Sequence, residues 1–146
     1  MDEPMNSRLQ RLTRLWHDTI PLSKFMAIEA VSFEQGVLIT RADRAANQNL
    51  HGTMFAGSIY SHATLTGWGR VWLALEAAGL KGDIVLADGH IRYHKPVNGV
   101  PECRSEPVEI DLSPLTRGRN ARVSIKVSLD GNAEFEGQFV VLAPRA

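Results

Sequence analysis

The chain has 146 residues, which is long enough for one hydrophobic core and too short for two ordinary domains. Hydrophobic residues make up 44% and charged residues 22%, a globular rather than a disordered composition. The 16 basic and 16 acidic side chains cancel, so no basic excess favours nucleic acid as a partner. The single cysteine, Cys103, excludes an internal disulfide and a cysteine-based metal site, and it fits a reducing cytosol.

The first segment predicts an amphipathic helix over about residues 5–20, ended by Pro21. Its leucines and its tryptophan recur at three- and four-residue steps with arginines between them, which is typical of a helix with one buried face. Residues 1–14 carry charged and polar groups at intervals and therefore lack the apolar run of a signal peptide, so we expect a cytoplasmic protein. Two short strands are predicted next, over 26–32 and 37–40.

The middle of the chain is marked by an absence of charge. Residues 45–69 contain no Asp, Glu, Lys or Arg, and the predicted helix over about 54–79 is apolar nearly all round. Such a helix is either buried or spans a membrane. Asn, His, Ser and Thr interrupt the run, whereas a span needs about 20 predominantly apolar residues. We therefore predict a helix enclosed by the rest of the fold and no membrane partner.

The remainder predicts four half-buried antiparallel strands. In the first, over 84–95, the apolar residues lie mostly at odd positions, and Gly89 suggests a bulge or a close backbone approach. A looser strand follows over 102–110, and residues 121–129 alternate clearly before the hairpin signal Asp130-Gly131 and a last strand. Half-buried strands need one apolar cover, so the order predicts an α+β domain over 1–146: a curved antiparallel sheet wrapped around one long helix, with an N-terminal helix.

This order, together with Asn49-Leu50-His51-Gly52-Thr53-Met54-Phe55-Ala56-Gly57-Ser58, resembles the hot-dog-fold thioesterases. More narrowly, residues 52–58 followed by Thr66-Gly67-Trp68 look like the thioesterase domain found fused to bacterial N-acetyltransferases. No acetyltransferase signature precedes the domain, so we expect a free-standing member. The resemblance covers about 26–142 and includes two further motifs, Ile91-Arg92-Tyr93 and Arg117-Gly118-Arg119.

The resemblance implies hydrolysis of an acyl thioester, with acyl-CoA or an acyl carrier as the substrate. We also expect a homo-oligomer, a dimer or a dimer of dimers, because a wrapped sheet leaves edge strands that pairing would cover. We expect no cofactor and no metal. Two rival functions stay open. A non-catalytic acyl-binding module would need no catalytic residues, and a hot-dog dehydratase is disfavoured because no histidine is paired with an acid in that group's usual arrangement.

A helix N-terminus can polarise the thioester carbonyl, because its first N–H groups lack partners within the helix and lie at the positive end of the dipole. The resemblance places this role on the amides of Phe55, Ala56 and Gly57. Glycines such as Gly52 and Gly57 leave the backbone open to a ligand. The alternative is that the glycines only permit tight packing of the helix on the sheet.

Water activation is the least complete part of the predicted site. Asn49 matches an asparagine that several relatives place near the attacking water, and an asparagine in a turn or at a helix N-cap is the alternative. His51, at the helix entrance, and His62 are the candidate bases. Thr64 stands where many relatives carry an aspartate or glutamate, contributed across the dimer interface, so that carboxylate is absent here.

Two further sets complete the prediction. Ser61 lies one turn before Thr64 on the same helix face, as a substrate-binding candidate, although both hydroxyls can instead bond to the helix backbone. Arg117 and Arg119 correspond to a region that meets the phosphates of coenzyme A in related thioesterases, and an exposed basic turn is the alternative.

Overall fold

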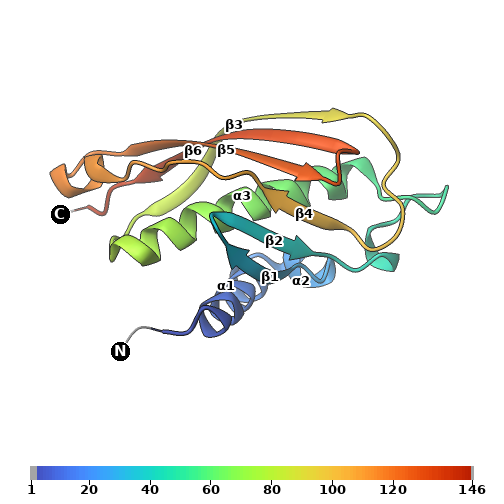
Figure 1. The fold of residues 1–146 in the computed structure, drawn as a ribbon, viewed down its shortest axis with the longest axis horizontal. Coiled ribbons are helices and arrows are strands. Elements are labelled where there is room, and N and C mark those ends of the chain that lie inside the picture. The colour runs from blue at the N-terminus through green and yellow to red at the C-terminus, as the bar shows by residue number, and fades with distance from the viewer. Residues whose placement is uncertain (1–2, 146) are drawn as a thin grey trace.

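A computed structural model describes residues 3–145 and contains one six-stranded antiparallel sheet in the order β1-β2-β4-β5-β6-β3 (Figure 1). The sheet curves around the long helix α3, and α1 lies on the far side of α3 from β3 and β6. This arrangement confirms the predicted α+β fold. The elements are α1 (Met5–Thr19), α2 (Pro21–Phe25), β1 (Glu29–Glu34), β2 (Val37–Arg41), η1 (Ala45–Asn47), α3 (Ala56–Ala78), β3 (Asp83–Tyr93), β4 (Glu102–Ser105), η2 (Ser113–Arg117), β5 (Ala121–Leu129) and β6 (Ala133–Leu142).

Helix α3 is enclosed, as its lack of charge predicts. Every second residue of β5 and β6 is buried against it, and Gly67 lets the Phe139 ring approach closely, because a Cβ there would lie 2.8 Å from the ring. The helix ends at Gly79, whose left-handed φ of 65° a side chain rarely adopts. Across residues 3–145, no helix combines the length and apolar character that crossing a membrane requires.

Helix α1 covers the part of α3 and β1 that the sheet leaves open. Its buried face, Leu9, Leu12 and Trp16, packs in one cluster with residues of α3, β1 and β2. Gly69 of α3 permits this contact, since a Cβ there would lie 2.7 Å from the Trp16 ring. Helix α1 therefore completes the core around α3.

The same helix closes one edge of the sheet. The Ala30 amide of β1 donates to the Thr13 hydroxyl at 3.0 Å, and the His17 ring donates to the Ile28 carbonyl at 2.7 Å. These side chains satisfy backbone groups that an edge strand otherwise presents to another chain. On β3 the Trp68 indole of α3 donates to the Ile84 carbonyl at 3.1 Å, near the start of the strand. Among the described residues, no helix side chain bonds to the backbone of residues 85–93.

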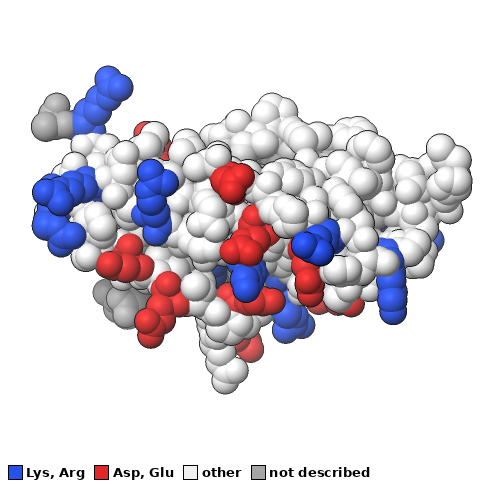
Figure 2. Space-filling model, turned by 90° about the horizontal axis from the view of Figure 1, so that it is seen from above, with Lys and Arg blue, Asp and Glu red and all other residues white. Residues whose placement is uncertain are grey.

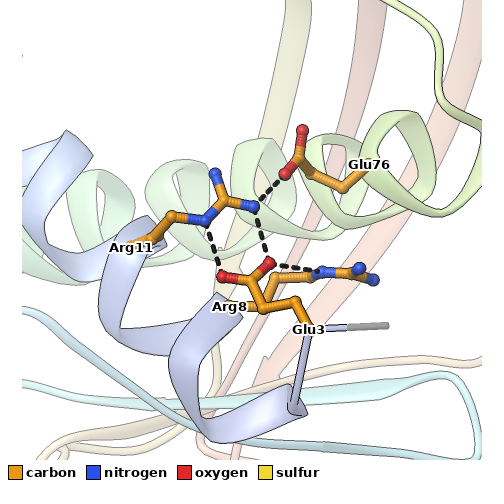
Figure 3. A network of polar contacts seen from close by, with 4 residues as sticks. All are labelled: Glu3, Arg8, Arg11 and Glu76. Atoms are coloured by element: carbon orange, nitrogen blue, oxygen red, sulfur yellow. Dashed lines mark hydrogen bonds and ion pairs between the residues drawn. The ribbon is translucent and has the colours of Figure 1, made fainter. Parts of the chain in front are cut away.

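Ion pairs connect α1 with the last turns of α3 (Figure 3). The Arg11 guanidinium contacts Glu3 at 2.8 Å, also contacts Glu76, and lies 5.1 Å from the Trp72 ring centroid. These groups are partly exposed, and ion pairs between exposed side chains contribute little to stability. Burial of Trp16, rather than the ion pairs, therefore accounts for most of the attachment of α1.

Two predicted strands differ from the structure. The expectation that odd positions of β3 face the core is wrong for its first half, because the pairing with β6 shifts between Leu86 and Asp88. Ile84 and Leu86 face α3 before this bulge, Val85 is 41% exposed, and after it Gly89 and Ile91 face inward. Gly89 also lies so close to the Tyr60 hydroxyl that a Cβ would overlap it, which confirms the predicted close approach.

Strand β4 is shorter than predicted and ends at Ser105, where residues 102–110 were expected to be extended throughout. Pro107 follows two residues later, and proline cannot donate to a β ladder.

A small polar cluster lies inside the core between α3 and β2. The Thr66 hydroxyl donates to the His62 carbonyl, so Thr40 donates to Thr66 and accepts from the Nε2–H of His62. The other ring nitrogen, Nδ1, has no partner in residues 3–145. Burial lowers the pKa of His62 to about 3, because a charge on this ring would be enclosed in apolar surroundings. His62 is therefore a neutral core residue.

Replacement of Trp16 by Ala is expected to lower the free energy of unfolding by about 3–5 kcal/mol, because a fully buried ring and its contacts are lost. Denaturant unfolding measures this change. Phe25→Ala, at a residue 71% exposed, is the matched control and is expected to change stability by less than about 0.5 kcal/mol. Equal effects of the two substitutions would contradict the account of α1 given above.

Stability is expected to fall as the pH drops from about 6.5 toward 3. Unfolded His62 binds a proton near its ordinary pKa of 6.5, whereas the folded ring stays neutral down to about pH 3, so the unfolded state binds more protons within this window. His62 contributes up to about 1.4 kcal/mol per pH unit to the slope of the unfolding free energy against pH. The unfolding free energy of His62→Gln, measured between pH 4 and 7, is expected to depend less steeply on pH. Identical slopes for both proteins would refute this.

Candidate functional site

A cavity of about 350 Å³ lies at the N-terminus of α3. Its floor is apolar, because Met54, Ile59 and Val97 are buried there, and polar groups lie around it. The lining comes from three places in the chain, namely the segment before α3, the first turns of α3 and the segment after β3: Asn49, Thr53, Met54, Ala56, Ile59, Tyr93, His94, Lys95, Pro96 and Val97. Few charged side chains lie at this end of the molecule, the right-hand end of Figure 2.

The first amides of α3 are available to a ligand. Within residues 3–145 the N–H groups of Ala56, Gly57 and Ser58 donate to no protein acceptor, and Ala56 and Gly57 are exposed. No side chain caps the helix, which begins after Phe55. The free amides and the helix dipole together suit an oxygen atom that carries partial negative charge.

The expectation for Phe55 is wrong in one respect. Its amide donates to the Asn47 carbonyl at 2.7 Å, so it cannot also bind a thioester oxygen. The Phe55 side chain is 55% exposed, and its ring lies against Gly57 so closely that a Cβ on Gly57 would overlap it. The absence of a side chain at Gly57 thus makes room for this ring, and the ring shields one side of the helix entrance.

Asn49 lines the cavity, but its carboxamide also organises the loop before α3. The side-chain oxygen accepts the amides of His51 at 2.9 Å and Thr53 at 3.2 Å, and the nitrogen donates to the Thr53 hydroxyl at 2.9 Å. These bonds match the turn alternative weighed for Asn49. The second proton on its nitrogen has no acceptor among the described residues, so one donor is left for a water.

The structure does not bring His51 into this cavity. Its side chain is exposed and is absent from the lining, and His51 meets Asn49 through its backbone amide. The prediction of His62 as the other candidate base is wrong, because the core encloses its ring. Neither histidine therefore lies where it can take a proton from a water in the cavity of a single chain.

Ser61 and Thr64 lie further along α3, are half-buried and do not line the cavity. The Thr64 hydroxyl donates to the Tyr60 carbonyl at 2.8 Å, the backbone bond that was the alternative interpretation of this residue.

Arg117 and Arg119 lie at the opposite end of the molecule from the cavity. Strand register shows this, because β5 starts beside Val141 and β3 starts beside Leu142, at the C-terminal end of α3. With 23 residues, α3 is about 34 Å long, and η2, the orange coil that precedes β5 in Figure 1, lies near its far end. One chain therefore does not unite these arginines with the amides of α3.

Sequence reasoning missed Tyr93 and Lys95 as lining residues. Tyr93 appeared there as part of the Ile91-Arg92-Tyr93 motif without a role in the site, yet its hydroxyl donates to the Ala56 carbonyl at 2.9 Å. Nothing local signals that contact, because the partners are 37 residues apart. His94 also lines the cavity, although its ring pairs with Glu134 at 3.4 Å. In the described part of the chain, no three His, Cys, Asp or Glu residues cluster as a metal site requires.

Residues 9–143 match the protein family described as "Putative thioesterase (yiiD_Cterm)". A protein from Shewanella oneidensis, called a "putative thioesterase", is 50% identical and superposes with a TM-score of 0.90 over 94% of this chain and 99% of that chain. A protein of unknown function from Chlorobaculum tepidum is 25% identical, with a TM-score of 0.85 over 95% of this chain and 96% of that one.

A thioesterase from Haemophilus influenzae shares the fold at 16% identity, with a TM-score of 0.71 over 92% of this chain and 90% of that one. The family match spans nearly the whole chain, and the sheet, the central helix and the N-terminal helix are as the hot-dog resemblance implies. The chain belongs to the yiiD_Cterm thioesterase family and has the hot-dog fold of thioesterases.

Proposed function

We propose that the protein hydrolyses acyl thioesters, of coenzyme A or of an acyl carrier, at the cavity where α3 begins. The observation that carries this proposal is the pair of unpartnered amides, Ala56 and Gly57, beside a cavity with an apolar floor. Both amides donate to the thioester oxygen, and the acyl chain lies along Met54, Ile59 and Val97. The relation to domains fused with N-acetyltransferases stays a prediction from the sequence.

The amides act most strongly on the transition state. Water attacks the carbonyl carbon, the C=O bond becomes a C–O⁻ single bond, and the amides stabilise this charge where the helix dipole adds to them. The added water gives up one proton to solvent, the oxyanion reforms the carbonyl, and the C–S bond breaks. The thiolate leaves and takes up a proton from solvent. Removal of one oxyanion donor from a serine protease costs roughly 10²–10³ in rate.

Water is held by amide and hydroxyl groups in this proposal. Asn49 offers its free N–H to the water, and Thr64 of a second copy orients it from the other side, although neither group is a base near neutral pH. His51 stays a prediction as the base, and its exposed ring would have to turn toward the cavity. Ser61, on the same face of α3 as Thr64, is assigned to binding substrate.

A second copy of the chain completes the site. α1 covers the outer edge of β1. At the other end of the sheet lies β3, in which Val85 and Tyr93 are exposed. Antiparallel pairing of two β3 strands about a two-fold axis places the C-terminal end of one α3 beside the N-terminal end of the other. Arg117 and Arg119 of one copy then lie on the side where the other copy binds its ligand, which supports their assignment to the phosphates of coenzyme A.

A non-catalytic acyl-binding module is the second candidate, and one observation favours it. The side chain that many relatives use as a carboxylate is Thr64 here, and its hydroxyl is engaged by its own helix. Such a protein would bind the acyl thioester at the same amides without releasing a thiol.

Thiol release over a panel of acyl-CoAs tests the function, and Ala56→Pro tests the amides. Proline removes the Ala56 N–H, and the position suits it, because Ala56 is the first residue of α3 and Phe55 before it is extended, with φ −64° and ψ 135°. The expected result is a kcat lowered by roughly 10²–10³ with the fold retained. Ala56→Gly keeps the amide, is the matched control, and is expected to retain most activity.

Binding of acyl-CoA without thiol release at any chain length would contradict the enzyme proposal and support the binding module. An unchanged kcat in Ala56→Pro would show instead that the Ala56 amide does not carry the oxyanion.

Val85→Lys is expected to weaken self-association and to lower activity with it, because lysine on an edge strand opposes pairing with another strand. Sedimentation velocity over a concentration series measures the effect. Val108→Lys is the control, since Val108 is similarly exposed but lies in the segment after β4. A wild-type protein that sediments as a monomer while fully active would contradict the shared site.

A further inference from the structure

Tyr93 joins the end of β3 to the start of α3 inside the cavity. Its hydroxyl donates to the Ala56 carbonyl at 2.9 Å, and the side chain is 48% exposed, so one part of it is bound while another part faces the cavity. Ala56 is the first residue of α3. The bond therefore holds the very turn whose amides are unpartnered.

The acceptor of this bond belongs to the same peptide unit as a proposed catalytic donor. The carbonyl of Ala56 and the N–H of Gly57 lie in one plane, and in a trans peptide they point in opposite directions. No cis peptide occurs in the described residues. A hydrogen bond on the Ala56 oxygen thus helps the helix to hold the direction of the Gly57 N–H. It also draws electron density toward the oxygen, which strengthens the N–H as a donor, as in other hydrogen-bonded chains of amides.

Tyr93 is itself held in place by the sheet. It pairs with Ala133 of β6, and the amides of the next two residues, His94 and Lys95, both donate to the Asn132 carbonyl at 2.8 and 3.0 Å. The Asn132 side chain donates in turn to the Pro96 carbonyl. The hydroxyl is therefore presented from a strand end with little freedom to move relative to the β5–β6 hairpin.

We propose that Tyr93 is a positioning residue for thioester hydrolysis, whose hydroxyl orients and polarises the Ala56–Gly57 peptide so that the Gly57 N–H receives the developing oxyanion. This inference rests on the proposed function. It also connects the open edge of the sheet with the chemistry, because β3 carries both that edge and the hydroxyl that holds the oxyanion donor. Tyr93 acts through the Gly57 amide and needs no contact with the substrate.

Tyr93→Phe removes only the hydroxyl and tests the proposal. The expected result is a kcat lowered by about 3- to 10-fold, the range for loss of one net hydrogen bond, with KM changed by less than about twofold. Tyr60→Phe is the matched control. Its hydroxyl also lies between α3 and β3, next to Gly89, and makes no hydrogen bond to the described residues, so its kcat is expected to equal that of the wild type.

The chemical shift of the Gly57 amide proton provides a readout that a merely structural tie would not predict. In Tyr93→Phe without substrate, this proton is expected to move upfield because the peptide is less polarised, and in Tyr60→Phe it is expected to stay in place. A wild-type kcat in Tyr93→Phe, an unshifted Gly57 proton, or an equal loss of kcat in Tyr60→Phe would each overturn the role of Tyr93. Absence of thiol release by the wild type would instead overturn the proposed function itself.

Discussion

Enclosure of α3 is the constraint on which the rest of the molecule depends. The curved sheet and α1 bury 11 of the 23 residues of α3, and an ionised side chain on that buried face would cost several kcal/mol. Arg70 is a charged residue of α3 that is buried. Its guanidinium carbon lies 5.0 Å from the Phe33 ring centroid, and burial lowers its pKa. At positions 67 and 69 of α3 only glycine fits without a shift, because the rings of Phe139 and Trp16 occupy the space that a Cβ would need.

Enclosure also explains where the chemistry lies. A helix wrapped along its sides can meet a ligand only at its ends, and the N-terminal end is the one with free N–H groups and the positive end of the dipole. The structure adds asymmetry between the two edges of the sheet. Thr13 and His17 satisfy backbone groups of Ala30 in β1 and of Ile28 just before it. On β3 a helix side chain bonds to the backbone only at Ile84 among the described residues, and the end of the strand supplies Tyr93 to the first turn of α3. Assembly through β3 and positioning of the oxyanion donor would then involve the same strand.

Much of the fold could be predicted from local patterns, and the misses have identifiable causes. Residues 45–69 without charge predicted the buried helix, and Asp130-Gly131 predicted the hairpin in which both residues adopt a positive φ. The inward face of β3 was predicted wrongly, because a bulge adds one residue and reverses the alternation, and that shift depends on the pairing with β6. His62 was open as a base until the structure showed that Thr40 and Thr66, from β2 and α3, enclose its ring.

By itself, the sequence determined that a long apolar helix is buried beneath half-buried strands and that its first turn carries glycine, because periodicity and composition are properties of neighbouring residues. Only the tertiary structure decided which amides stay free. The Phe55 amide is used by Asn47, while those of Ala56 and Gly57 remain open. It also placed Arg117 and Arg119 at the far end of α3 and brought Tyr93 to Ala56 across 37 residues. These outcomes depend on strand register and on contacts between distant segments, which no local pattern encodes.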